Sequence, residues 1–227
     1  MTLKNKLAPS VMCCDLLEVK PQIELFERTG IDLLHVDVMD GHFVPNLTLG
    51  TDFVRRLSDF SSIPLDVHLM TEDPDFWIDA LIAMNALKEG LYVSVHAEAA
   101  RHLQRTLVKI HATGAKALLA LNPGTPLVMA EEVTDVIDGL LIMTVNPGFA
   151  GQKVTSNAFD KIARARAFLD AHGRPDAEIE VDGNVSIPNA IRMRDAGANI
   201  FVAGTASIFR DGMEQNIYNF RKEVFGE

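Results

Sequence analysis

The sequence of 227 residues predicts an α/β protein with the (β/α)8 architecture, the TIM barrel. Short runs of aliphatic and β-branched residues recur along the chain, and segments with helical apolar periodicity separate them. Eight βα units can be counted, and strict alternation of strand and helix is typical of a parallel sheet that closes into a barrel. Because residues 1–227 contain no linker or low-complexity tract, we expect one domain.

The expected strands are all short, and none approaches the ~18 apolar residues of a membrane span. They are Leu7–Met12, Leu33–Met39, Leu65–Met70, Tyr92–His96, Ala117–Leu121, Gly139–Val145, Glu178–Val181 and Ile200–Ala203.

Helical periodicity fills the segments between these strands, and a glycine follows each of the clearest examples, as it does at many helix ends. We expect helices over Asp15–Arg28, Pro74–Leu87, Ala99–Ala112, Ala158–Ala171 and Pro188–Ala196. An open doubly wound sheet is the alternative architecture. The first βα turn lacks the G-x-G-x-x-G phosphate loop of many such sheets, which favours the barrel.

The charge balance argues against two classes of partner. With 31 acidic and 21 basic residues, the net charge of -10 repels nucleic acids and anionic membranes. A small phosphate still fits, because backbone N–H groups can supply local positive potential. The first ten residues contain no signal-peptide pattern, so we expect a cytoplasmic protein. The adjacent Cys13 and Cys14 are expected to be reduced thiols.

Polar residues at the ends of three strands indicate a metal site. The period of two puts His35, Asp37 and Met39 on one inward face, and Asp66 and His68 form a similar pair. Active sites of barrels lie at the carboxyl ends of the strands. Any one such residue is better explained as a hydrogen-bonded barrel filler, but three strands supplying buried carboxylates and imidazoles favours a metal.

The predicted ligands of one divalent ion are His35, Asp37, His68 and Asp182, the last at the end of strand seven. We expect Asp66 to lie deeper, without a clear partner, and to be structural.

Glycine-rich turns after the last three strands predict a phosphate site, because bare backbone can approach phosphate oxygens closely. The candidate segments are 147–151, 183–184 and 204–205. Met39, Met70 and Met143 fall near strand ends, where they could either wall the reacting carbons or fill the core.

Six segments carry a resemblance to a known family. In chain order they are L-H-V-D-V-M-D-G-H-F-V-P-N, D-V-H-L-M, L-N-P-G-T-P, T-V-N-P-G-F-A-G-Q, V-D-G-N-V and A-G-T-A-S-I-F. From Pro9 to Phe209 the sequence resembles the ribulose-phosphate 3-epimerase family, including its allulose-6-phosphate 3-epimerase branch.

The resemblance implies a barrel of the ribulose-phosphate-binding type that acts on a phosphorylated ketose and forms a homo-oligomer. It implies one Zn, Fe, Mn or Co ion per chain on the same four ligands, with Asp37 and Asp182 as the acid/base pair that inverts C3 through an enediolate. Substrate contacts carry over to a larger set: Ser10, Met39, His68, Gly148, Phe149, Ala150, Gly151, Gly183, Asn184, Gly204 and Thr205.

Small departures from the family pattern bear on the substrate. Ala150 and Asn184 stand where ribulose-phosphate epimerases usually have glycine, and the segment 12–17 looks more like the allulose-6-phosphate branch. These differences slightly favour D-allulose 6-phosphate, which would give D-fructose 6-phosphate. The alternative is conversion of D-ribulose 5-phosphate to D-xylulose 5-phosphate.

Competing functions fit the sequence less well. Related barrel decarboxylases carry a D-x-K-x-x-D motif, in which His68 here replaces the lysine, and no lysine stands convincingly at a strand end for a Schiff base. A non-catalytic protein that binds metal or phosphosugar is the alternative from another class.

Overall fold

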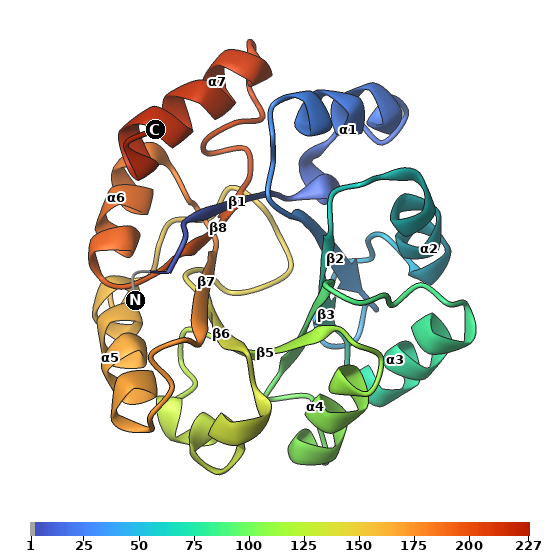
Figure 1. The fold of residues 1–227 in the computed structure, drawn as a ribbon, viewed down its shortest axis with the longest axis vertical. Coiled ribbons are helices and arrows are strands. Elements are labelled where there is room, and N and C mark those ends of the chain that lie inside the picture. Colours follow the sequence, from blue (N-terminus) through green and yellow to red (C-terminus); the bar gives the residue numbers. More distant parts are fainter. Residues whose placement is uncertain (1–2) are drawn as a thin grey trace.

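The computed structural model describes residues 3–227, which form eight parallel strands in one sheet (Figure 1). The strands are β1 (Lys6–Pro9), β2 (Leu34–Met39), β3 (Leu65–Met70), β4 (Tyr92–His96), β5 (Lys116–Leu121), β6 (Gly139–Met143), β7 (Glu178–Asp182) and β8 (Ile200–Ala203). Their order in the sheet is β1-β8-β7-β6-β5-β4-β3-β2.

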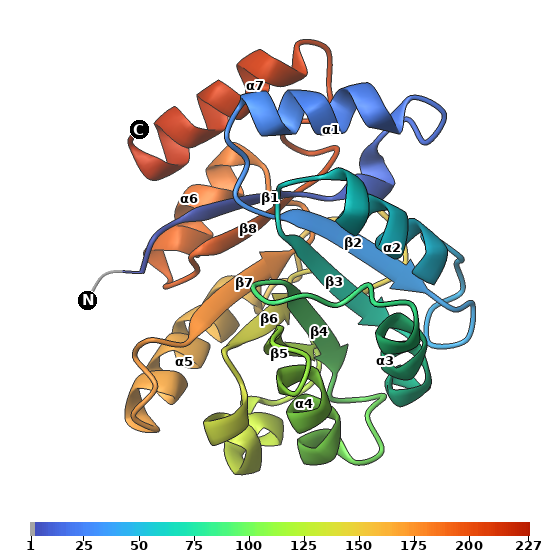
Figure 2. The ribbon, with the colours of Figure 1, turned by 45° about the vertical axis from the view of Figure 1, so that its right-hand side comes forward.

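The sheet closes into a barrel between β1 and β2. A single parallel bridge joins Ser10 to His35 there, and the N–H of Leu33 donates to the carbonyl of Leu7 over 3.4 Å. The views of Figures 1 and 2 agree on a ring of strands surrounded by helices. The predicted (β/α)8 TIM barrel is therefore confirmed.

The helices form the outer ring. They are α1 (Val19–Arg28), α2 (Thr51–Phe60), α3 (Pro74–Ala83), α4 (Leu103–His111), α5 (Ala158–Ala171), α6 (Ile187–Asp195) and α7 (Met213–Phe220). 3-10 segments cover Val11–Cys13 and Leu127–Val136, and a π-helical turn covers Arg221–Phe225. Among the residues described, no helix combines the length and apolar character needed to cross a membrane.

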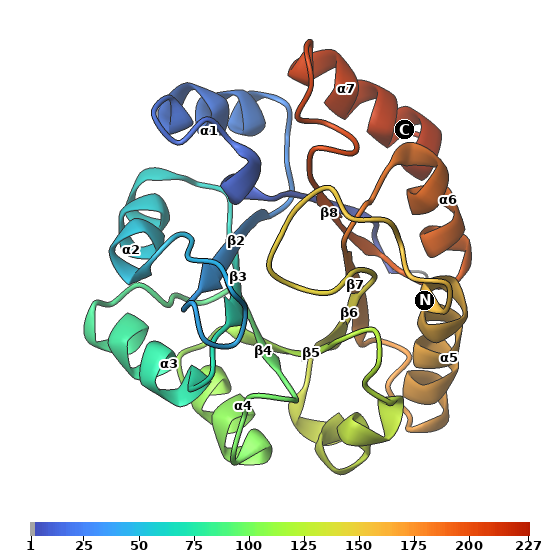
Figure 3. The same cartoon turned by 180° about the vertical axis from the view of Figure 1, so that it is seen from behind.

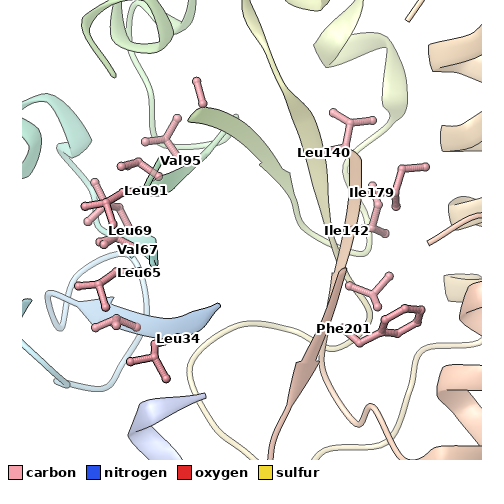
Figure 4. Close-up of a cluster of buried hydrophobic side chains, with 14 of the residues drawn as sticks. Leu34, Leu65, Val67, Leu69, Leu91, Val95, Leu140, Ile142, Ile179 and Phe201 are labelled. Carbon is pink, nitrogen blue, oxygen red and sulfur yellow. The ribbon is translucent and has the colours of Figure 1, made fainter. Parts of the chain in front are cut away.

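The two faces of each strand have different surroundings. Outward-facing side chains such as Leu34, Val67 and Ile142 are fully buried in the layer between strands and helices (Figure 4). Burial of this apolar surface is the main stabilising term of the fold, at roughly 1.5–3 kcal/mol for each such side chain. The inward face carries a mixture of apolar and polar residues, which creates separate layers within the barrel.

A polar network closes the end of the barrel where the strands begin. The hydroxyl of Tyr92 donates to Glu178 Oε2 over 2.7 Å, and Lys6 Nζ donates to Glu178 Oε1 over 2.5 Å. Lys116 Nζ donates to the Tyr92 oxygen over 2.9 Å. These donors satisfy the hydrogen-bonding capacity of the buried Glu178 carboxylate and balance its charge. The network leaves the opposite end of the barrel free for an active site.

Several predicted boundaries are wrong, and local backbone bonds explain the differences. β1 ends at Pro9 rather than Met12, because the N–H groups of Cys13 and Cys14 turn back onto the carbonyls of Ser10 and Val11. Helix α3 ends at Ala83, shortly before Asn85 adopts a left-handed φ of 52°. Strands β3, β4 and β8 have the predicted bounds.

Candidate active site

Four side chains meet at the carboxyl ends of β2, β3 and β7. His35 Nε2 lies 3.2 Å and His68 Nδ1 lies 3.3 Å from the same oxygen of Asp37, Oδ1. Asp182 Oδ2 lies 3.9 Å from His68 Nδ1. One donor atom from each of the four residues falls within 4.8 Å of all the others. The structure therefore brings together the four predicted metal ligands.

This donor set fits a divalent metal ion. Two imidazole nitrogens and two carboxylate oxygens suit Zn²⁺, Fe²⁺, Mn²⁺ or Co²⁺. Within residues 3–227, His68 Nδ1 is fully buried and makes no hydrogen bond of regular geometry, although it lies 3.3 Å from Asp37 Oδ1. A nitrogen lone pair held in this way against carboxylates is left unsatisfied without a cation. The residues present thus fit the ion that the sequence predicts.

The carboxylate of Asp66 has a clear partner, contrary to the prediction that it lacks one. Its Oδ2 accepts from His35 Nδ1 over 2.6 Å, and Glu180 Oε1 lies 3.1 Å from the same nitrogen. All three side chains are fully buried. Nδ1 of His35 therefore donates toward two carboxyl groups, and Nε2 is the nitrogen that faces the ligand cluster.

The charges of the cluster separate the pKa values of its members. Burial lowers the pKa of His35, but Asp37 and Asp66 outweigh it and hold that pKa well above its ordinary value. Burial lowers the pKa of His68. Burial and the charge of Asp37 raise the pKa of Asp182 to about 7, whereas the two histidines keep the pKa of Asp37 below its usual range. The two carboxylates therefore differ in proton affinity.

A cleft opens above the cluster. Most predicted site residues line it: Ser10, Asp37, Met39, Gly148, Phe149, Ala150, Gly151, Asp182, Gly183, Asn184, Gly204 and Thr205. Met70 and Met143 also line it, which places sulfur-bearing apolar surface next to the ligands. His35 and His68 lie fully buried beneath the floor. Contact of His68 with a substrate stays a prediction.

The loop after β7 requires its glycine. Gly183 has a φ of 114°, and a Cβ built there would come within 2.5 Å of a methyl carbon of Val145. The next residue, Asn184, adopts a left-handed φ of 48°, and its side-chain amide donates to the carbonyl of Gln152 over 2.6 Å. Asparagine tolerates this left-handed conformation, and its side-chain amide joins the loop after β7 to the loop after β6.

Two backbone N–H groups at this end of the cleft can receive an anion. Among residues 3–227, no backbone carbonyl accepts from the N–H of Asn184 or Gly204. Both residues line the cleft, Asn184 two residues after the end of β7 and Gly204 directly after the neighbouring strand β8. Exposed N–H groups in glycine-containing turns form anion-binding concavities. The placement fits the predicted phosphate site.

The long loop after β6 covers the same end of the barrel. Figure 3, from behind, shows it reaching over the middle of the strand ring. The side-chain amide of Asn46, in the loop after β2, donates to the carbonyl of Gly148 over 2.8 Å. Gln152 Nε2 donates to the carbonyls of Asn146 and Phe149, which fixes the curl of the loop. The loop that carries Ala150 is thus attached to the opposite side of the ring.

Sequence reasoning missed some residues of the site. Glu180 precedes Asp182 by two positions, and this period would have placed it on the same inward face. Cys13 lines the cleft because the 3-10 turn of residues 11–13 carries it inward, which no periodicity predicted. Neither Cys13 nor Cys14 is bridged.

Comparisons of sequence agree with this geometry. A sequence profile described as "Ribulose-phosphate 3 epimerase family" matches residues 6–209. The ribulose-phosphate 3-epimerase of Bacillus subtilis is 45% identical over 201 residues, which cover 88% of this chain and 91% of that protein. The chloroplastic ribulose-5-phosphate-3-epimerase of Arabidopsis thaliana is 43% identical, with 88% of this chain and 70% of that protein covered.

Solved structures of lower identity share the fold. The 3-hexulose-6-phosphate synthase of Salmonella typhimurium superposes with a TM-score of 0.69 at 13% identity, covering 97% of this chain and 99% of that chain. At this identity the likeness concerns the barrel alone. The profile and the relatives identify more than the barrel: the chain belongs to the ribulose-phosphate 3-epimerase family and is an isomerase that acts on sugar phosphates.

Proposed function

We propose that the protein inverts C3 of a phosphorylated ketose by two-base proton transfer, with one divalent metal ion held by His35, Asp37, His68 and Asp182. The observation that carries this proposal is the convergence of four donor atoms within 4.8 Å at the floor of the cleft. Two of the four are carboxylates from different strands, which is the arrangement that proton exchange on opposite faces of one carbon requires.

The two carboxylates divide the work. Asp37 projects from β2 and Asp182 from β7, so they reach the floor from different sides of the ring. In one direction Asp37 takes the C3 proton and Asp182 returns a proton to the opposite face, and in the reverse direction the roles exchange. When bound, the ion would supply Lewis acidity against the negative charge that develops on the ketose oxygens. The methionines around the cluster exclude water from this reaction zone.

The other end of the substrate is held by backbone. Gly183, Asn184, Gly204 and Thr205 line the cleft on the side of β7 and β8 and would bind the phosphate through N–H groups. Such binding needs no lysine or arginine in the cleft, which agrees with the acidic composition of the chain. Ala150 and Phe149, from the loop after β6, would cover the phosphate from above.

We propose D-ribulose 5-phosphate as the preferred substrate, giving D-xylulose 5-phosphate. The named relatives support it, since the Bacillus subtilis enzyme shares 45% identity over most of both chains. The sequence alone slightly favours D-allulose 6-phosphate, and Ala150 and Asn184 keep that hexulose phosphate as the second candidate. Both residues line the cleft beside the proposed phosphate position, where their side chains change the length of sugar that fits.

Turnover of the two sugar phosphates tests this choice. The purified protein is stripped of metal, reconstituted separately with Zn²⁺, Fe²⁺, Mn²⁺ or Co²⁺, and supplied with each substrate. The kcat/KM for D-ribulose 5-phosphate is expected to exceed that for D-allulose 6-phosphate with every active metal. A reversed ratio would move the assignment to the allulose-6-phosphate branch.

Deuterium exchange separates catalysis from mere binding. In deuterated water the product is expected to carry deuterium at C3, because the proton passes through a carboxylate that exchanges with solvent. A protein that only binds metal or phosphosugar leaves C3 protonated in substrate recovered after long incubation. That result would contradict the epimerase proposal.

The oligomeric state and the cellular location of the protein are also proposed. We propose a homo-oligomer in the cytoplasm, which size-exclusion chromatography with light scattering and cell fractionation test separately.

A further inference from the structure

A chain of three side chains leads away from the metal ligands and has no part in the proton transfer described above. His68 Nε2 lies 2.8 Å from His96 Nε2, and His96 Nδ1 lies 3.3 Å from Glu98 Oε2. His68 and His96 are fully buried, and Glu98 reaches partly exposed surface at the end of the chain. The nitrogen of His68 that faces away from the ligand cluster is therefore occupied.

The two imidazoles approach through their nitrogens. Their ring centroids are 5.0 Å apart with 25° between the planes, while the Nε2 atoms are only 2.8 Å apart. The ring of Phe43 packs against His96 with a centroid distance of 4.7 Å. This geometry is that of a hydrogen bond between nearly coplanar rings, in which one nitrogen must donate and the other accept.

Glu98 decides which nitrogen donates. Its Oε1 accepts from the backbone N–H of Asn122 and from the hydroxyl of Thr125, and its Oε2 faces His96. These bonds lower the pKa of Glu98 to about 2 although burial raises it, so the group is an ionised acceptor at neutral pH. An ionised carboxylate only accepts, which requires the proton of neutral His96 to sit on Nδ1.

We propose that Glu98 and His96 are positioning residues that fix the tautomer of His68. With its proton on Nδ1, His96 offers the lone pair of Nε2, and His68 must donate from Nε2. The Nδ1 lone pair of His68 is then bare and points at Asp37 and Asp182, 3.3 and 3.9 Å away.

The opposite arrangement holds at the other histidine. His35 donates from Nδ1 to Asp66 over 2.6 Å and presents Nε2 to the same ligand cluster. The two imidazoles thus offer different nitrogens, and each is set by its own outer partner. Loss of such a partner typically lowers metal affinity by roughly 10–100-fold, because the partner preselects the tautomer that binds metal.

The proposal rests on the metal centre of the proposed function, but its tests use no substrate. Failure of epimerisation with normal metal binding would leave it standing, and failure of the tautomer test would leave the epimerase proposal standing. The two can therefore be told apart.

The first test reads the tautomers directly. The protein with ¹⁵N-labelled histidine is stripped of metal, and long-range ¹H–¹⁵N correlation spectra are recorded at pH 8. His68 is assigned by loss of its signals in His68→Gln. The protein is expected to show the Nε2–H form for His68 and the Nδ1–H form for His96. An Nδ1–H form of His68 would overturn the proposal.

The second test measures affinity for Co²⁺ alone by titration of its visible absorption. His96→Leu removes the acceptor and is expected to raise the Kd for Co²⁺ by roughly 10–100-fold. His96→Gln keeps an acceptor oxygen near the former Nε2 position and is expected to stay close to the wild-type Kd. Thermal unfolding of the metal-free variants establishes that each is folded.

A matched control completes the design. His102→Gln changes an exposed histidine outside the chain of contacts and is expected to bind Co²⁺ like the wild type. A folded His96→Leu that keeps the wild-type Kd would overturn the proposal, as would equal weakening in His96→Gln and in the control. If His96→Leu does not fold, the Kd of His96→Gln for Co²⁺ and the tautomers in the wild-type spectra test the proposal.

Discussion

The hydroxyl of Ser10 donates a hydrogen bond of 2.7 Å to Asp37 Oδ2, while Asp37 Oδ1 faces His35 and His68. The two oxygens of one carboxylate thus have separate surroundings. Ser10 is buried and follows directly on β1, so the position of Asp37 on β2 depends on contact across the seam of the barrel. The proposed base is held on two sides before any ligand arrives.

Ser10→Ala is expected to lower kcat by roughly tenfold or more, because a hydrogen bond to a charged group is worth about 1.5–3 kcal/mol. The lost bond lets the Asp37 carboxylate rotate and changes its basicity. Steady-state kinetics with the reconstituted enzyme measure this. Ser62→Ala, which removes a hydroxyl hydrogen bond to Glu27 at a position that does not line the cleft, serves as the control. An unchanged kcat would show that the Ser10 bond does not orient the base.

Asp37→Asn and Asp182→Asn are each expected to reduce turnover by at least about 10³-fold, since each removes one of two bases and one metal ligand. Circular dichroism should show a native fold in both variants. Asp195→Asn, on the surface at the end of α6, is expected to keep full activity. Near-normal turnover of either site variant would rule out the two-base scheme.

Metal removal is expected to abolish activity and to lower the melting temperature. The four proposed ligands from three strands would hold the ion in the folded state, so the ion would stabilise that state by mass action. Differential scanning calorimetry of stripped and reconstituted protein measures the shift, with Ca²⁺ as the control because it prefers oxygen ligands. Full activity after exhaustive chelation would contradict a metal-dependent mechanism.

Gly183→Ala is expected to raise KM more than it lowers kcat. A Cβ at this position would come within 2.5 Å of Val145, and the left-handed φ adds strain, so the loop must move. The displaced N–H groups belong to the proposed phosphate site. Inhibition by inorganic phosphate should weaken in parallel. The matched control is Gly173→Ala, whose Cβ meets nothing within 4 Å and whose φ of 72° imposes similar strain outside the site.

The thiols are expected to react slowly with iodoacetamide at pH 8. Burial raises the pKa of Cys13, and burial together with Cys13 raises the pKa of Cys14 to about 12. A raised thiol pKa favours the unreactive protonated form, so the thiolate fraction of Cys14 at pH 8 falls roughly a thousandfold. Mass spectrometry before and after unfolding in urea measures both rates. Rapid labelling of the folded protein at pH 8 would contradict the predicted shifts.

The sequence was sufficient to predict the barrel and the convergence of the four proposed ligands at one end of it. Strands such as Leu65–Met70 are apolar on the face toward the helices and polar on the other, so their bounds and their inward residues follow from a period of two. The ligands His35 and Asp37 lie within one such run, and His68 and Asp182 occupy equivalent places on other strands.

The hydrogen bonds around the ligands could not be predicted in the same way. The bond between His35 and Asp66 depends on register between β2 and β3, and the contact of His68 with His96 depends on register between β3 and β4. Register is a property of closed tertiary structure. The early end of β1 also escaped prediction, because the apolar run continues through Val11 and Met12 into a 3-10 turn.

We expect the seam between β1 and β2, where the barrel closes, to open more easily than the other strand pairs. β2 and β3 pair along six residues, whereas β1 and β2 are joined by one bridge, from Ser10 to His35, and by the long N–H bonds of Asp32 and Leu33 to the carbonyl of Leu7. Local opening events begin where the fewest backbone bonds must break, so amide protons beside this seam should exchange with solvent before those of β3 and β4. Since His35 is itself one side of the bridge, such an opening would also release the metal ion. Slow amide exchange at the seam would then indicate that the metal site is occupied. The rate at which the seam opens would set an upper limit on the residence time of the ion.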